Sequence, residues 1–154
     1  MEEKESQARA LLDKTNRQFN ECNALYNAAA QRCGLSDAAF WTLYALVTSC
    51  EPLTQNRIAA DWCIPKQTLN SAVAAMVKKG LLALCPGKGV HSGKIVTLTA
   101  EGRALAERTV VPVIAAEEKA IRAFGLASAE EMHRLAQRHL ECLQREFETI
   151  SAFP

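Results

Sequence analysis

Apolar side chains recur every three or four positions over the first third of the chain, which is the spacing of one face of an α-helix. The stripe predicts a long helix ending near Gly34, and it consists of Leu12, Thr15, Phe19, Cys22, Tyr26, Ala29 and Cys33. A second helix is predicted between Ser36, whose hydroxyl suits an N-cap, and Pro52, which cannot continue a helix. Its inner face consists of Phe40, Leu43, Tyr44 and Val47.

Two shorter helices are predicted next, separated by a tight connection. Thr54 can cap the first of them, which runs to about Trp62. After a two-residue connector, Pro65 occupies a first-turn position, and the second helix runs to Lys79 before Gly80 ends it. The inner face of this second helix consists of Leu69, Val73, Met76 and Val77.

Strand character follows these helices. The segments 81–85 and 94–98 are short and mostly apolar, and the connection 86–93 contains three glycines. This pattern predicts a β-hairpin with a basic tip.

Two longer helices complete the predicted structure. Thr99 can cap the first, which reaches about Phe124, although Pro112 inside it should bend or split it. Ser128 and Glu131 form an S-x-x-E capping box for the last helix. The broad apolar face of that helix consists of Met132, Leu135, His139, Cys142, Phe147 and Ile150.

This order of elements predicts a mainly α protein with a small β-hairpin. Two helices joined by a three-to-four-residue turn and followed by a hairpin are the parts of a winged helix-turn-helix. We expect one domain over residues 1–154, with the winged helix-turn-helix at 36–98 and dimerisation helices at 6–34 and 99–151. A homodimer is expected because a small lobe cannot cover the apolar stripes of the first and last helices.

Charge is unevenly distributed along the chain, although the formal net charge is only +1. Residues 54–94 contain six Lys or Arg and a single acid, Asp61, whereas the segments before and after them each carry a balance of −2. A cationic middle segment between acidic flanks favours binding of a polyanion such as nucleic acid.

Several classes of protein are disfavoured by the sequence. The six cysteines, at positions 22, 33, 50, 63, 85 and 142, include no C-x-x-C pair, so we expect reduced thiols and no zinc knuckle. No stretch approaches the roughly 18 uncharged apolar residues of a membrane span, and the charged start lacks a signal-peptide block, so a cytoplasmic protein is expected. Without a glycine-rich phosphate loop, nucleophile elbow or paired carboxylates, we expect neither an enzyme nor a cofactor.

Four segments resemble the MarR family of winged helix-turn-helix transcriptional regulators. Residues 53–59 (LTQNRIA) are similar to the first helix of the family's motif, and residues 64–71 (IPKQTLNS) to the start of its recognition helix. Residues 78–82 (KKGLL) match the turn into the wing, and 96–102 (VTLTAEG) match a strand-to-helix signature in which threonine caps the next helix. The resemblance implies a homodimeric, ligand-responsive repressor that binds a pseudo-palindromic operator in duplex DNA.

The wing departs from the family's pattern. The family usually carries an Asp-x-Arg pair at the tip, whose aspartate orients an arginine in the minor groove, whereas this chain has His91-Ser92-Gly93-Lys94. Because no acid steadies Lys94 and lysine lacks the planar guanidinium, weaker readout by the wing is expected. Cys63 also replaces a glycine common in the turn, so it must accept the backbone angle there.

The outward positions of the predicted recognition helix carry side chains suited to DNA. Gln and Asn can bond to adenine edges, Ser and Thr to several bases, and the flanking lysines to phosphates. The candidate DNA-binding residues are Thr54, Gln55, Lys66, Gln67, Thr68, Asn70, Ser71, Lys78, Lys88, His91 and Lys94. A merely solvated helix face is the alternative interpretation, and the rival function is a winged-helix protein-interaction module that does not bind DNA.

The resemblance also implies a cleft for a small, often aromatic effector. The residues on the segments that line this cleft in the family are Tyr26, Phe40, Trp41 and Tyr44. Aromatic residues at helical spacing more often belong to a plain core, which is the alternative interpretation of these four residues.

Two further candidate sites are disfavoured by the sequence. Cys22 resembles a cysteine of the peroxide-sensing branch of the family, which leaves a thiol-based redox regulator as an alternative, but no basic residue adjoins it in sequence. His139 and Cys142 share a helix face, yet two ligands without a third are weak support for zinc, so no metal is expected.

Overall fold

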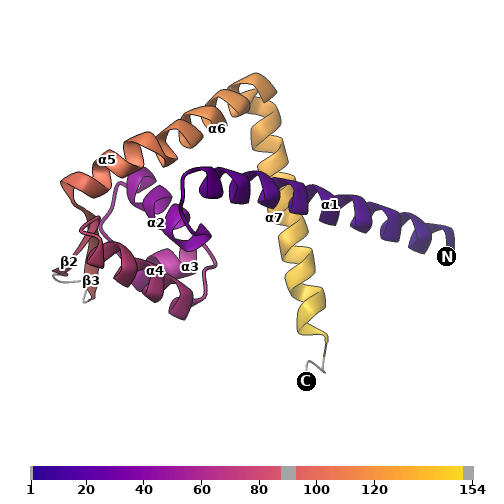
Figure 1. Cartoon of the computed structure of the whole chain (residues 1–154). Helices are drawn as coiled ribbons and strands as arrows, with labels where there is room; N and C mark the ends of the chain where they lie inside the picture. The colour runs from indigo at the N-terminus through magenta and orange to yellow at the C-terminus, as the bar shows by residue number, and fades with distance from the viewer. Residues whose placement is uncertain (1, 88–92, 151–154) are drawn as a thin grey trace. The chain divides into compact units, whose positions relative to one another are not determined.

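The computed structural model of the chain describes residues 2–87 and 93–150 (Figure 1). Its helices and strands are α1 (Glu2–Arg32), α2 (Asp37–Thr48), β1 (Leu53–Thr54), α3 (Gln55–Asp61), α4 (Lys66–Lys78), β2 (Leu82–Pro86), β3 (Lys94–Leu98), α5 (Ala100–Arg108), α6 (Val110–Phe124) and α7 (Leu126–Glu148). They form two compact units, Met1–Val113 and Ile114–Pro154, whose boundary falls inside α6. The predicted mainly α class with a small β-element is confirmed.

Three helices begin at the hydroxyl caps that the sequence predicts. The Ser36 hydroxyl accepts a hydrogen bond from the Ala39 amide at 3.4 Å and begins α2. Thr54 accepts from the Arg57 amide at 3.2 Å, and Thr99 from the Gly102 amide at 3.0 Å. Each cap satisfies an amide that has no partner within its own helix, which fixes where α2, α3 and α5 begin.

The sheet has three antiparallel strands in the order β1-β3-β2, one more than the predicted hairpin. Strands β2 and β3 pair from Leu82↔Leu98 to Pro86↔Lys94, and β1 joins the free edge of β3 through Leu53↔Val96 and Thr54↔Ile95. A two-residue strand is too short to leave an alternating pattern, so periodicity could not predict β1. Its pairing attaches the wing directly to the residue that caps α3.

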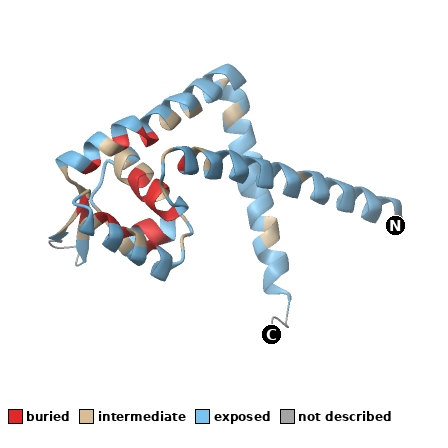
Figure 2. Cartoon of the chain, viewed as in Figure 1, coloured by how far each residue is buried: buried red, intermediate tan, exposed pale blue. Residues whose placement is uncertain are grey.

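The core of the first unit lies among α2, α3 and α4, where Figure 2 shows most of the buried residues. Its largest fully buried side chains are Phe40, Leu43, Ile58, Leu69, Val73, Val110 and Thr42. The single hydroxyl among them donates from Thr42 to the Ala38 carbonyl at 2.6 Å, so this polar group is buried with a partner. Helix α4 packs against both α2 and α3, which holds its outer face in a fixed orientation.

The predicted fifth helix is split in two, and the break falls just before the proline. α5 ends at Arg108 and α6 begins at Val110, with Thr109 between them and its hydroxyl donating to the Leu105 carbonyl at 2.6 Å. Pro112 has no N–H to offer the carbonyl one turn earlier, and its ring crowds that carbonyl, so the helix breaks on the N-terminal side.

The predicted capping box of the last helix is wrong. Helix α7 begins at Leu126 after Gly125, so Ser128 lies inside the first turn rather than at the cap. Gly125 has φ 97°, a left-handed backbone angle, and its carbonyl accepts from the Ala129 amide at 2.9 Å. Glycine adopts this angle at little cost, which starts the helix three residues earlier than the serine pattern indicates. Pro65 likewise stands one position outside α4, as its N-cap.

Over residues 2–87 and 93–150, no helix combines the length and the apolar character needed to cross a bilayer.

Candidate nucleic-acid interface

Helix α4 has one buried and one exposed face. Leu69, Val73 and Met76 are buried, and Val77 is half-buried beside them. The exposed side chains of α4 include Lys66, Gln67, Thr68, Asn70, Ser71, Ala74 and Lys78. The predicted division of the helix into an inner apolar and an outer polar face is confirmed.

The turn between α3 and α4 depends on an unusual backbone angle at Cys63. This residue has φ 49°, in the left-handed region that favours glycine, and it is the non-glycine residue with positive φ in the described part of the chain. The amide of Ile64 then reaches back to the Ala59 carbonyl at 2.9 Å, which closes the turn. As expected from the sequence, Cys63 accepts the angle that the turn imposes.

A groove of about 800 Å³ runs beside the start of α3. Its walls come from four parts of the chain: the segment before β1, strand β1 with α3, the outer face of α4, and the start of β3. The lining residues are Ser49, Glu51, Pro52, Leu53, Thr54, Gln55, Asn56, Arg57, Asp61, Asn70, Gly93 and Lys94. The groove therefore brings together Thr54, Gln55, Asn70 and Lys94, four candidate DNA-binding residues that the sequence places on three separate elements.

The base of the wing lies against the cap of α3. A Cβ placed on Gly93 would stand 3.4 Å from the methyl group of Thr54, and the Gly93 carbonyl accepts from the Gly87 amide at 2.9 Å. Lys94 follows at once and is exposed. Of the predicted wing contacts, Lys94 is thus placed beside α3, whereas Lys88 and His91 lie outside the described residues.

An ion pair on α3 was not predicted from the sequence. Arg57 Nε lies 2.6 Å from Asp61 Oδ2, and the two side chains are 69% and 41% exposed. Their i,i+4 spacing on one helix face is a sequence signal that could have identified the pair. Both residues line the groove, so the pair belongs to the same surface as the predicted DNA contacts.

The four aromatic residues predicted for an effector cleft form one cluster, and a fifth, Trp62, joins it. The Trp41 ring lies 5.0 Å from Tyr26, 5.2 Å from Phe40 and 5.4 Å from Tyr44, measured between centroids. Trp62 stacks on Trp41 at 4.9 Å and meets Tyr44 edge-on at 5.1 Å. Phe40 is fully buried, while the other four rings are half-buried. The cluster therefore connects the end of α1, α2 and the end of α3.

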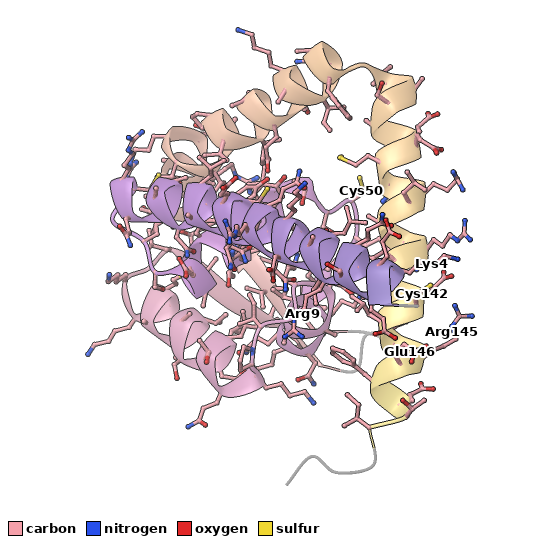
Figure 3. All side chains as sticks on the ribbon, turned by 90° about the vertical axis from the view of Figure 1, so that its right-hand side faces the viewer. Lys4, Arg9, Cys50, Cys142, Arg145 and Glu146 are labelled. Carbon is pink, nitrogen blue, oxygen red and sulfur yellow. The ribbon has the colours of Figure 1, made fainter. Side chains whose placement is uncertain are left out.

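The disfavoured sites have simple local surroundings. Cys22 is an exposed, free thiol on α1. On α7, Arg145 donates to the Cys142 sulfur at 3.3 Å, and Figure 3 labels both side chains. Residues 2–87 and 93–150 contain no group of three or more His, Cys, Asp or Glu side chains that could hold a metal ion.

Known proteins share both sequence and fold features with this chain. A family model described as MarR family matches residues 34–90, a range that includes α2 to β2. No match was found among curated proteins.

Solved structures of MarR-type proteins share the fold over most of the chain. A MarR family regulator from Neisseria meningitidis superposes with a TM-score of 0.76 at 23% identity and covers 90% of this chain and 96% of its own. S. aureus MepR, solved in complex with DNA, gives a TM-score of 0.66 at 18% identity, with 84% and 93% of the two chains covered. CouR from Rhodococcus jostii, solved with p-coumaroyl-CoA, gives 0.64 at 20% identity, with 79% and 85% covered.

These similarities confirm both the fold class and the family resemblance predicted from the sequence. Residues 34–90 therefore match the MarR family, and the chain has the winged-helix fold of the solved MarR-type structures.

Proposed function

We propose that this protein is a transcriptional regulator that binds duplex DNA with α4 in the major groove and the wing on the adjacent backbone. The observation that carries the proposal is the groove in which Asn70 of α4, Thr54 at the cap of α3 and Lys94 of β3 meet. A helix with an exposed polar face of Gln, Asn, Ser and Thr, flanked by lysines, suits base edges and phosphates respectively. The likeness to S. aureus MepR, which was solved with DNA, supports the same function.

DNA binding is tested directly by fluorescence anisotropy with a random-sequence 30-base-pair duplex pool at two salt concentrations, followed by selection of the duplexes bound most tightly. We expect binding that weakens steeply with salt and a selected sequence with dyad symmetry. A variant with Lys66→Glu and Lys78→Glu should lose binding, whereas Lys119→Glu, a charge reversal outside residues 54–94, should keep it. No binding by the wild-type protein would favour the rival function, a protein-interaction module.

We further propose that the regulator is a homodimer joined through its terminal helices. Figure 2 shows that most of α1 and α7 is exposed, and no described residue of α7 is buried. The exposed large apolar side chains of these helices include Leu11, Leu12, Phe19, Leu25, Met132, Leu135, Leu140, Phe147 and Ile150. Monomeric proteins rarely leave so many such groups in water, and a second copy offers an identical apolar partner.

The face of α7 opposite its apolar stripe is polar and provides the control for a dimer test. Arg134 donates to both carboxylate oxygens of Glu131, at 2.6 and 2.8 Å, and this bond lowers the pKa of the Glu131 carboxyl. Met132→Glu with Phe147→Glu should convert a dimer into monomers in light scattering, because both changes place a charge on the apolar stripe. Gln137→Glu adds one charge to the polar face and should leave the dimer intact, and a monomeric wild type would refute the proposal.

A small aromatic effector that releases the DNA, as in a repressor, is the last part of the proposed function. Support comes from the aromatic cluster, four of whose five rings are half-buried, and from the likeness to CouR and to an S. aureus MarR solved with salicylate. The DNA complex is titrated with salicylate and with hydroxycinnamates. An effector that binds the cluster should quench tryptophan fluorescence and, over the same concentration range, reduce the anisotropy of the labelled duplex. Release by peroxide instead, abolished by Cys22→Ser, would support the redox alternative.

A further inference from the structure

We infer that Arg57 binds a backbone phosphate of the DNA and that Asp61 is a positioning residue that orients the Arg57 guanidinium for this contact. The inference rests on the proposed function, because it assigns roles to two residues beside the predicted DNA contacts. Neither residue was among those selected from the sequence.

The ion pair leaves the outer edge of the guanidinium, which carries its two terminal nitrogens, available to a phosphate. Arg57 donates through Nε to Asp61 Oδ2 at 2.6 Å. Within the described part of the chain, the two terminal nitrogens of Arg57 make no hydrogen bond, and the side chain is 69% exposed. The outer N–H groups of the planar guanidinium are parallel, which matches two oxygens of a phosphate, and a hydrogen bond at Nε leaves both of them free to bind it.

The groove places Arg57 on the surface proposed to face DNA. Arg57 shares the groove with Asn70, on the exposed face of α4, and with Lys94, at the base of the wing. A phosphate that enters the groove between α4 and β3 can therefore contact Arg57, which projects from α3. This is the side on which the first helix of a helix-turn-helix crosses the DNA backbone.

The pair also supplies a feature that the wing lacks. The sequence of the wing provides no acid to steady Lys94, and lysine donates as a hydrated point charge. On α3, by contrast, an aspartate one turn later accepts a hydrogen bond from the arginine Nε. Less side-chain entropy is lost when a held arginine binds its phosphate, so the contact is stronger than that of a free cation.

A second acid in the groove, Glu51, allows the positioning role of Asp61 to be distinguished from the effect of its negative charge. Glu51 and Asp61 both line the groove, but among the described residues only Asp61 bonds to a cationic side chain there. Electrostatics alone predicts that removing either carboxylate strengthens DNA binding, because each repels phosphate. Positioning predicts opposite signs: Glu51→Ala strengthens binding, and Asp61→Ala weakens it.

The experiment measures anisotropy of the wild-type protein and its variants on the duplex selected by the wild type, over a range of salt concentrations. We expect Glu51→Ala to tighten binding about twofold from the lost repulsion, and Asp61→Ala to weaken it about threefold to tenfold from the lost orientation. Asp61→Asn, which keeps an oxygen acceptor for Nε and removes the charge, should bind at least as tightly as wild type. Arg57→Gln should reduce the slope of log K against log salt by about 0.9, the loss of one phosphate contact.

A double variant separates positioning from folding. Asp61 lies in the last turn of α3, where a negative charge is unfavourable to the helix dipole. Removing this charge should not destabilise the helix, so Asp61→Ala should have a melting temperature no lower than that of the wild type. In an Arg57→Gln background, Asp61→Ala should no longer weaken binding. Tighter or unchanged binding by Asp61→Ala in the wild-type background would overturn the inference and leave the proposed function standing, whereas a wild type that binds no duplex overturns both.

Discussion

The backbone of Leu81 lies so close to Gly102 that no side chain fits between them. A Cβ built on Gly102 would lie 1.9 Å from the Leu81 carbonyl oxygen and 2.9 Å from its carbonyl carbon. The same oxygen accepts from the Thr99 amide and from the Thr99 hydroxyl, each at 3.1 Å. The first turn of α5 is thereby held against the residue that precedes β2, which fixes the wing to the helix that follows it.

Gly102→Ala should therefore lower the free energy of unfolding by about 2–3 kcal/mol, because the atoms in the way belong to a bonded backbone that cannot rotate aside. Urea denaturation of the wild type and the variant measures the change. Glu101→Ala, an exposed change in the same turn, should stay within about 0.5 kcal/mol of wild type. Equal midpoints for Gly102→Ala and wild type would show that α5 shifts freely against Leu81.

Cys63 offers a second stability prediction, since it holds φ 49° without being glycine. Cys63→Gly should raise the free energy of unfolding by up to about 1 kcal/mol, because glycine adopts this angle without steric cost. Cys63→Val should lower it by about 1–3 kcal/mol, since a β-branched residue is poorly accommodated at positive φ. The two changes are compared by thermal melting, and a valine variant as stable as the glycine variant would contradict the strain at this turn.

The exposed residues of α4 should divide into two classes by their effect on DNA binding. Lys66→Ala and Lys78→Ala should weaken binding to all sequences alike and reduce the salt slope by about one unit each, because a phosphate contact carries no base information. Gln67→Ala and Asn70→Ala should cost about 1–3 kcal/mol on the selected duplex and little on random duplexes. If all four variants lose affinity equally on both probes, the assignment of base-reading residues on this helix is wrong.

Much of the fold follows from local patterns in the sequence. Three helices, α2, α3 and α5, begin where a hydroxyl caps them, at Ser36, Thr54 and Thr99, because each cap acts within three residues of itself. The inner face of α4 was likewise predictable, because apolar residues at helical spacing have only one core to face.

The features that the sequence did not predict depend on contacts between distant residues. Strand β1 exists because β3 offers it an unpaired edge, and two residues carry no pattern of their own. Helix α7 begins directly after Gly125, which adopts a left-handed backbone angle, and not at the serine cap predicted at Ser128. The groove required β3 and α3 to be placed side by side, so Arg57 and Asp61 acquired a candidate role only once the wing was positioned.

The wing provides the last prediction, which concerns the outer positions of the DNA site. Lys94 is exposed at the start of β3 and forms no ion pair with a described acid. A lysine that no acid holds samples many rotamers and suits a narrow A·T-rich groove poorly. Ordering a glycine-rich tip costs further conformational entropy. The wild-type protein should therefore discriminate weakly among bases at the outer edges of its site, with the wing contributing mainly charge.

Selection from duplexes randomised at the outer positions tests this prediction with three proteins. Lys94→Arg alone should change the selected sequences little, because nothing holds the new guanidinium in place. Lys94→Arg combined with Ser92→Asp, a position outside the described residues, should create a preference for A·T-rich outer positions, since the added carboxylate can orient the arginine as Asp61 orients Arg57. Strong outer preferences already present in the wild type would show that Lys94 or its neighbours in the wing read the minor groove without such support.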